Sequence, residues 1–230
     1  MQYTRFFRPA LFTLSFILIA LATNAQTRQR WSAGPRLGLN LSNFNGDGPF
    51  VGVSVPIETK FLPGFMAGAG VMYSDISRFG FAADVLYSQR GARYELGNSR
   101  QRINYLELVT TARYFLNDEG AFRPNIYIGP SFNLRTSANF DPTQGSPDDR
   151  FDNKDVTNRF DVGATAGIQF NFRVRNRQRF LIDARYTQGF ADVMTSPGNT
   201  RNQTITIGLG YNFGIGQNYR PGARKLPLKR

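Results

Sequence analysis

Residues 203–213 read Gln-Thr-Ile-Thr-Ile-Gly-Leu-Gly-Tyr-Asn-Phe, and every second position is apolar. The apolar positions are Ile205, Ile207, Leu209, Tyr211 and Phe213. A period of two predicts a β-strand with one apolar and one polar face. The apolar face ends in two aromatic residues, and the other face carries only small or neutral groups. This combination is typical of a strand that meets lipid on one side and polar groups on the other.

The same alternation occurs seven more times upstream. The predicted strands are 31–41, 64–74, 79–88, 104–116, 124–134, 160–172 and 179–188. Together with 203–213 they make eight strands, each of about the ten residues that a tilted strand needs to cross the hydrocarbon layer. Pro130 has no N–H to donate within its strand, so we expect a β-bulge there.

The connections between these strands alternate in length. The long ones are 42–62, 89–102, 135–159 and 189–202, and the short ones are 75–78, 117–123 and 173–178. Long loops at one end and tight turns at the other are the signature of an outer-membrane barrel. The sequence therefore predicts an all-β fold: an eight-stranded antiparallel up-and-down transmembrane β-barrel with long extracellular loops and short periplasmic turns.

Charged side chains separate a membrane barrel from a soluble one. Within the predicted strands they occupy only the polar register, at Arg36, Asp84, Glu107, Arg113, Asp183 and Arg185. An Arg or Lys on the lipid face near mid-membrane costs about 2–4 kcal/mol, so a lipid-facing surface should lack such residues. A soluble eight-stranded carrier is the alternative, and it would place apolar residues inside and charges outside. The observed register favours the membrane barrel.

The composition excludes several function classes. The 230 residues include no Cys and no His, so disulfides, thiolate chemistry, the commonest metal ligand and most hydrolase triads are excluded. We therefore expect no catalytic, cofactor or metal site. The formal net charge is +12. Much of it lies near the two ends of the chain and no nucleic-acid-binding motif accompanies it, so we expect no nucleic-acid partner.

The two ends of the chain differ from the region between them. Residues 1–25 have a basic start, an apolar stretch and the small-residue site Thr23-Asn24-Ala25, which predicts a cleaved signal peptide. An uncleaved membrane anchor is the alternative, but the apolar stretch is short for a spanning helix. Residues 26–213 form the predicted barrel domain. Residues 214–230 form a basic tail, which we expect to be disordered and solvated.

The chain resembles the PorT-like outer-membrane β-barrel family of Bacteroidota, which are Gram-negative bacteria. The residues that carry the resemblance are Gly38-Leu39-Asn40-Leu41-Ser42, Leu86-Tyr87-Ser88-Gln89-Arg90-Gly91, Tyr105-Leu106-Glu107, Ile128-Gly129-Pro130, Arg185-Tyr186 and Gly189. The resemblance implies an integral protein of the cell outer membrane. A component of a protein secretion system is one role that it suggests. The last strand also resembles the signal read by the barrel-assembly machinery, at Thr206, Gly208, Tyr211 and Phe213.

The interior of an eight-stranded barrel is just filled by side chains. Because buried charges must be paired, the six inward charges predict an internal network that plugs the lumen. We expect a structural or interaction protein that contacts outer-membrane lipid and meets a protein partner through the extracellular loops or the basic tail. The alternatives are a narrow channel or small-ligand carrier and an outer-membrane enzyme, for which the sequence offers no catalytic constellation. The basic turn around Arg173, Arg175, Arg177 and Arg179 is expected on the periplasmic side, where it can meet phospholipid headgroups or an acidic partner.

Overall fold

The computed structural model describes residues 31–46, 59–74, 78–95, 99–117, 120–142, 151–175, 178–195 and 199–215. Its strands are β1 (Trp31–Asn45), β2 (Thr59–Ser74), β3 (Phe79–Tyr94), β4 (Arg100–Phe115), β5 (Phe122–Asp141), β6 (Phe151–Asp152), β7 (Phe160–Arg175), β8 (Gln178–Gly189) and β9 (Arg201–Gly214). The predicted signal peptide and the tail beyond residue 215 lie outside the described residues. In the described part of the chain, no helix is long and apolar enough to cross a membrane.

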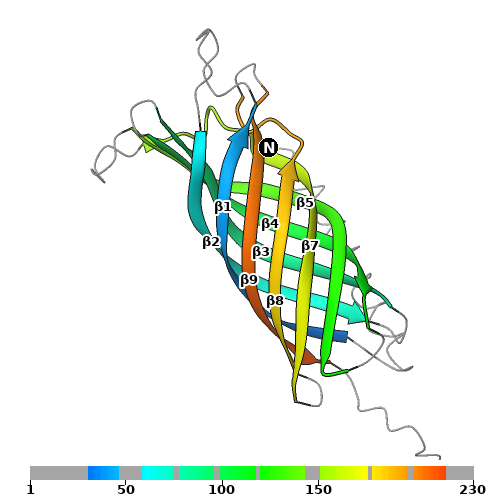
Figure 1. Ribbon diagram of the computed structural model, residues 1–230. Coiled ribbons are helices and arrows are strands. Elements are labelled where there is room, and N and C mark those ends of the chain that lie inside the picture. Colours follow the sequence, from blue (N-terminus) through cyan, green and yellow to red (C-terminus); the bar gives the residue numbers. More distant parts are fainter. Residues whose placement is uncertain are drawn as a thin grey trace, which may run out of the picture.

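The strands close into a barrel, as the sequence predicts (Figure 1). The hydrogen-bonded order is β4-β3-β2-β1-β9-β8-β7-β5, and a further β4–β5 pairing completes the ring. All eight pairings of this ring are antiparallel. The two-residue strand β6 pairs with the loop-end part of β5 and is not one of the eight strands of the barrel wall. The prediction of an eight-stranded up-and-down barrel is confirmed.

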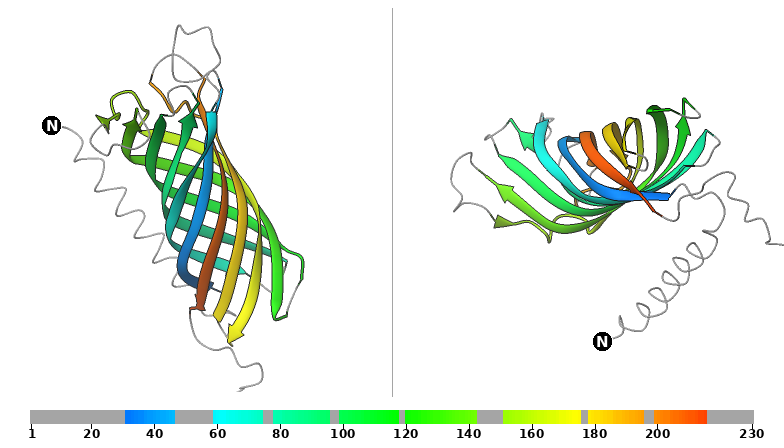
Figure 2. Two further views of the ribbon diagram at one scale, coloured as in Figure 1. Left: turned by 60° about the vertical axis from the view of Figure 1, so that its left-hand side comes forward. Right: turned by 90° about the horizontal axis from the view of Figure 1, so that it is seen from below.

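The barrel has two chemically distinct ends, which we call the turn end and the loop end. The turn end carries the short connections β2–β3, β4–β5 and β7–β8, and the loop end carries the other connections. The N–H of Ile215 donates to the carbonyl oxygen of Trp31 over 2.8 Å, so the described chain both begins and finishes at the turn end. Two further views of the strands are given in Figure 2.

Burial follows the alternation that the sequence predicts. In β9, Ile207 is 60% exposed and Leu209 50%, whereas Thr206 is 3% exposed. On every strand of the barrel wall, the outward positions carry exposed apolar side chains, for example Leu37, Phe81, Leu108 and Ile128. An apolar belt of this extent on all sides of a barrel with a polar interior is the arrangement that lipid requires.

Several strands extend beyond their predicted ends at the loop end. β1 runs to Asn45 and β2 begins at Thr59, within the predicted loop 42–62, and the predicted loop 89–102 is wrong. β3 continues to Tyr94 and β4 begins at Arg100, which leaves only residues 95–99 as the connection. At Gly91 the backbone has a φ of 152°. A Cβ there would lie 1.9 Å from the carbonyl oxygen of Gln101, so the close approach of these strands requires glycine. Likewise, β5 runs to Asp141, well into the predicted loop 135–159.

The bulge expected at Pro130 is absent. On one side of it Val109 pairs with Ser131, and on the other Ala112 pairs with Ile128, in one unbroken register. Pro130 lacks an N–H donor, but no extra residue is inserted into the strand beside it. On the other side of β5, the pairing with β7 also runs through Pro130 without a shift in register. The irregularity between β4 and β5 falls instead between Asn104 and Tyr105, where the strands leave the apolar belt.

Candidate functional site

The middle of the lumen is crossed by an ion pair between β1 and β3. The Nε of Arg36 lies 3.3 Å from Oδ1 of Asp84, and both side chains are about 7% exposed. The contact is an ion pair rather than an aligned hydrogen bond, since neither atom has a hydrogen-bond partner among the described residues. Between the two strands, Gly70 of β2 leaves the space that the Asp84 carboxylate occupies. A second nitrogen of Arg36, Nη1, donates to Oδ1 of Asn212 over 2.7 Å.

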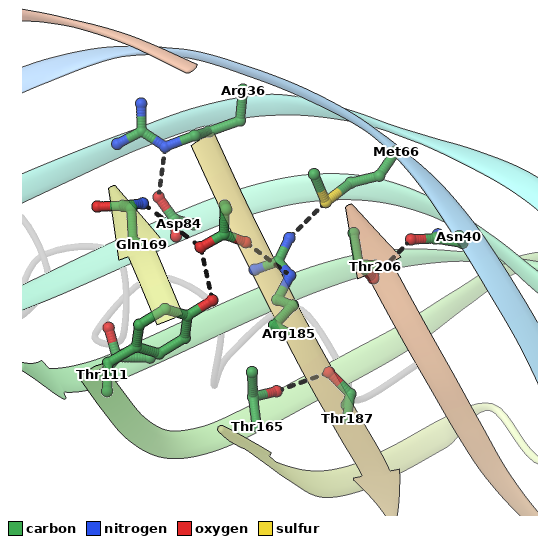
Figure 3. Close-up of polar contacts among 12 residues, drawn as sticks. Arg36, Asn40, Met66, Asp84, Thr111, Thr165, Gln169, Arg185, Thr187 and Thr206 are labelled. Atoms are coloured by element: carbon green, nitrogen blue, oxygen red, sulfur yellow. Dashed lines mark hydrogen bonds and ion pairs between the residues drawn. The ribbon is translucent and has the colours of Figure 1, made fainter. Parts of the chain in front are cut away.

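A second ion pair lies beside the first, on β8 (Figure 3). Oδ1 of Asp183 is 3.7 Å from the Nε of Arg185. The hydroxyl of Tyr127 donates to the other carboxylate oxygen of Asp183 over 2.6 Å. The phenol ring of Tyr127 lies against Gly167, where a Cβ would come within 2.6 Å of the ring. Arg185 also contacts the sulfur of Met66 across the lumen. Nε2 of Gln169 also donates to Oδ2 of Asp183 over 3.5 Å, so this carboxylate is held by groups from β5, β7 and β8.

Arg113 is held by neutral groups. Its Nη1 donates to the amide oxygens of Gln169 over 2.8 Å and Asn125 over 3.1 Å. Its guanidinium also lies 4.3 Å from the centroid of the Tyr127 ring, within the range of a cation–π contact. Amide and aromatic groups thus solvate a charge that we expected to meet a carboxylate.

Glu107 pairs with an arginine that we had placed in a loop. Nη2 of Arg90 lies 2.6 Å from Oε1 of Glu107, and both side chains are almost fully buried. Sequence analysis missed Arg90 because the strand was ended at Ser88. The alternation itself could have identified Arg90 as an inward residue, because it lies two positions after Ser88 and six after Asp84, both of which face inward. Asp161 was also missed as a member of the network, and its Oδ2 accepts from Asn202 over 2.9 Å.

The six predicted site residues therefore all lie inside the barrel, but as separate groups. The inner charged side chains of the described chain include the acids Asp84, Glu107, Asp161 and Asp183 and the arginines Arg36, Arg90, Arg113, Arg123 and Arg185. A small space remains between the first two pairs, lined among others by Arg36, Asp84, Asp183 and Arg185. Polar contacts continue along the wall between Thr206 and Asn40 and between Thr165 and Thr187 (Figure 3).

An apolar cluster lies at the loop end of the barrel; we call it the cap. Its buried members are Phe44, Ala92, Tyr94, Ile103, Tyr105, Ala138, Val193 and Met194, with Phe140 packed against them. The first six and Phe140 come from the outer parts of β1, β3, β4 and β5, whereas Val193 and Met194 come from the connection between β8 and β9. The cap therefore joins strand extensions to a loop.

The β8–β9 connection, which contributes to the cap, is fixed to the connection between β5 and β7. Thr157 forms a β-bridge with Met194, and the side-chain amide of Asn158 donates to the carbonyls of Asp192 and Met194 over 2.8 and 3.0 Å. Arg135 donates from Nη1 to the carbonyl oxygens of Lys154 and Thr157. Nearby in this outer region, hydrogen bonds from Lys154 lower the pKa of Asp152.

A smaller apolar cluster lies near the turn end. It contains Met72, Ala82 and Phe115. The guanidinium of Arg123 covers the Phe115 ring at 4.2 Å from its centroid. The charged groups of the lumen thus lie between these two apolar clusters, and a third cluster of Met66, Leu86 and Val109 lies among them.

The four residues of the predicted assembly signal lie on β9. Thr206 and Gly208 face inward, and the Thr206 hydroxyl donates to Oδ1 of Asn40 over 2.8 Å. Tyr211 and Phe213 lie near the turn end with ring centroids 4.9 Å apart. Other aromatic pairs share this height, including Trp31 with Tyr73 and Phe79 with Tyr114. Such a row is typical of a membrane interface.

Among the described residues, no three side chains of His, Cys, Asp or Glu gather as a metal ion requires. The inward carboxylates instead face arginines, amides or phenols. These groups offer ion pairing and hydrogen bonding.

Comparison with known proteins agrees with this geometry. Residues 24–195 match the model of a family described as "Outer membrane protein beta-barrel domain". Among curated proteins, none matches. Similar solved structures include the attachment invasion locus protein Ail of Yersinia pestis in complex with the heparin analogue sucrose octasulfate, with 16% identity over 80% of this chain and 99% of that one and a TM-score of 0.43.

Two further solved structures have the same general likeness. The outer membrane protein OprG of Pseudomonas aeruginosa is 12% identical over 80% of this chain and 96% of its own, with a TM-score of 0.47. The outer membrane protease OmpT of Escherichia coli is 8% identical over 83% and 99%, with a TM-score of 0.40. Likenesses this distant carry nothing about ligands or activity.

Proposed function

We propose, from the premise that this chain belongs to the outer membrane protein beta-barrel domain family, that it is a structural or interaction protein whose lumen is plugged. It is an outer-membrane β-barrel protein in contact with lipid. In such barrels the short turns face the periplasm and the larger loops face outward, so we assign the loop end to the outside of the cell. The proposed role places its contacts with partners at that end.

The observation that carries the plugged lumen is the cap above a layer of compensated charges. Tyr94, Ile103 and Tyr105 are at most 2% exposed although they lie at the mouth of the barrel. Beneath them, Arg90 and Glu107 are in contact at 2.6 Å. An ion that entered would have to displace apolar packing first and then compete with buried ion pairs, which costs several kcal/mol.

Planar-bilayer recording of the purified protein tests this proposal. We expect no stepwise conductance, because a closed eight-stranded barrel has no continuous aqueous path. Large and reproducible conductance steps would contradict it. Heat-modified migration on a denaturing gel would show beforehand that the sample is folded.

A narrow channel or small-ligand carrier is the second candidate function. The observation that favours it is the small space beside Arg36, Asp84, Asp183 and Arg185, whose volume of about 10 Å³ is enough for about one water molecule. The variants Glu107→Gln and Asp183→Asn separate the two. Loss of folding supports the structural network, whereas transport that is lost with folding intact supports a channel.

The interaction role draws on the four connections at the loop end, which join β1 to β2, β3 to β4, β5 to β7 and β8 to β9. We further propose that residues 1–25 are a cleaved signal peptide and that Thr206, Gly208, Tyr211 and Phe213 are read by the barrel-assembly machinery. We propose that the chain is most closely related to the PorT-like group of Bacteroidota. A component of a protein secretion system is one role that this relationship suggests. We also propose that the protein has no enzymatic activity. A pull-down from native outer membrane tests the interaction role, and recovery of the barrel alone under mild solubilisation would contradict it.

A further inference from the structure

The outer faces of β2, β3 and β4 carry a row of basic side chains at the loop end. The row contains Lys60, Arg93, Arg100 and Arg102, and we call it the basic row. In the ladder, Lys60 lies directly opposite Arg93, and Arg93 lies directly opposite Arg100. Arg102 follows two positions further along β4, opposite Gly91. The ends of these strands gather at the loop end in Figure 1.

Like charges placed directly opposite on neighbouring strands are destabilising. Among the described residues, hydrogen bonds and ion pairs account for little of this charge. Lys60 forms an ion pair with Glu95. The Nε atoms of Arg93 and Arg100 are buried and have no hydrogen-bond partner in the described part of the chain. Asp141 lies opposite Arg100 in the ladder, so one carboxylate adjoins the row on β5.

On β4 the row lies just outside the apolar belt, and on β2 the exposed side chain of Phe61 adjoins Lys60. Leu106 is the last exposed apolar residue of β4 toward the loop end, and it is 46% exposed. From residue 106 to residue 102 a strand rises about 13 Å, which is about 9 Å in height at a tilt of about 45°. The headgroup layer extends about 5–7 Å beyond the hydrocarbon. Arginine side chains that lean toward the membrane therefore reach the level of lipid headgroups.

We infer that the basic row binds the phosphate groups of a phosphorylated glycolipid in the leaflet at the loop end. Guanidinium groups bind phosphate oxygens through two parallel N–H donors, and this bidentate geometry suits arginine better than lysine. A bound phosphate between Arg93, Arg100 and Arg102 also removes the repulsion between neighbouring strands. The acyl chains of the same lipid then cover Leu106 and Leu108 below.

This inference rests on the assignment of the loop end to the outer side of the membrane, but it does not depend on whether the lumen conducts ions. It also differs from contact with the periplasmic leaflet, because the basic turn around Arg173 and Arg175 lies at the opposite end of the barrel.

The test compares two triple variants with the same change in charge. The first carries Arg93→Gln, Arg100→Gln and Arg102→Gln. The control carries Lys154→Gln, Arg159→Gln and Arg201→Gln, which are exposed side chains at the same end but outside the row. The proteins are placed in nanodiscs with lipid A that carries two phosphates, and bound lipid is counted by native mass spectrometry after mild release. Heat-modified gel migration checks that all the proteins are folded.

We expect the row variant to bind lipid A about a hundredfold more weakly than the native protein, since each basic side chain near an anionic surface contributes substantially. The control should remain within about threefold, and lipid A without phosphates should bind the native protein no better than the row variant. Equal binding by the row variant would overturn the proposal, as would an equal loss in the control. Binding of a soluble sulfated oligosaccharide through the row, without lipid A binding, would overturn the assignment to a lipid.

Discussion

Gly70 and Asp84 lie directly opposite each other on β2 and β3, and the absence of a side chain at Gly70 makes room for the Asp84 carboxylate. A Cβ on Gly70 would lie 1.7 Å from Oδ1 of Asp84. The same oxygen is the one that faces Arg36. The position of the central ion pair therefore depends on a glycine that belongs to neither partner's strand, because Gly70 lies on β2, between β1 and β3.

The variant Gly70→Ala should move the Asp84 carboxylate away from Arg36 and destabilise the barrel by about 1–3 kcal/mol, the usual cost of overpacking. Unfolding in urea after reconstitution into lipid measures the change. The double variant with Asp84→Ala supplies the control, because the added methyl then meets no carboxylate. Its destabilisation should be smaller than the sum of the two single effects; strict additivity would show that the glycine serves another purpose.

The variant Tyr127→Phe should destabilise the barrel by about 1.5–3 kcal/mol, since it removes a hydrogen bond to a charged and largely buried acceptor. The bond in question is the 2.6 Å contact with Asp183. The matched control is Tyr186→Phe, which loses a 2.7 Å hydrogen bond to Gln188 on the exposed outer side. The control should change stability by less than about 0.5 kcal/mol. Equal effects in both variants would argue against a special role for Asp183.

The variant Leu37→Arg tests the lipid-facing register. Leu37 is 62% exposed and lies near the middle of the apolar belt, so an arginine there should cost about 2–4 kcal/mol in a lipid bilayer. The variant Leu116→Arg, at the turn end, should cost no more than about 1 kcal/mol because its side chain reaches the interface. Denaturant unfolding in the bilayer gives both values. A Leu37→Arg protein as stable as the native one would place this face in water.

The inward and outward faces of the barrel strands could be predicted from the sequence, because the lipid requires an apolar side chain at every second residue. That requirement makes Ile205, Ile207 and Leu209 recognisable without any knowledge of their neighbours. The strand ends could not be predicted in this way. Beyond Ser88 both faces of β3 meet polar surroundings or the cap, so Gln89 and Arg90 read as a loop.

The pairing of the inner charges could not be predicted from the sequence either. Which arginine meets Glu107 depends on the register of β3 against β4 and on how far β3 extends. Arg113 has amides and a ring as neighbours because β5 and β7 present Asn125, Tyr127 and Gln169 at its height. Likewise, Val193 and Met194 enter the cap from a loop, where no periodic pattern marks an inward residue.

The access of water to the middle of the lumen tests the plugged barrel most directly. The chain has no native cysteine, so Ser131→Cys introduces a single thiol at a fully buried inward position whose hydroxyl has no hydrogen-bond partner among the described residues. Thr195→Cys, at an exposed position of the loop end, is the positive control. Labelling of each protein with a water-soluble maleimide is followed in bilayers, from both sides, before and after unfolding. We predict rapid labelling of the Thr195 variant and labelling of the Ser131 variant only after unfolding; rapid labelling of the folded Ser131 variant from either side would contradict the plug.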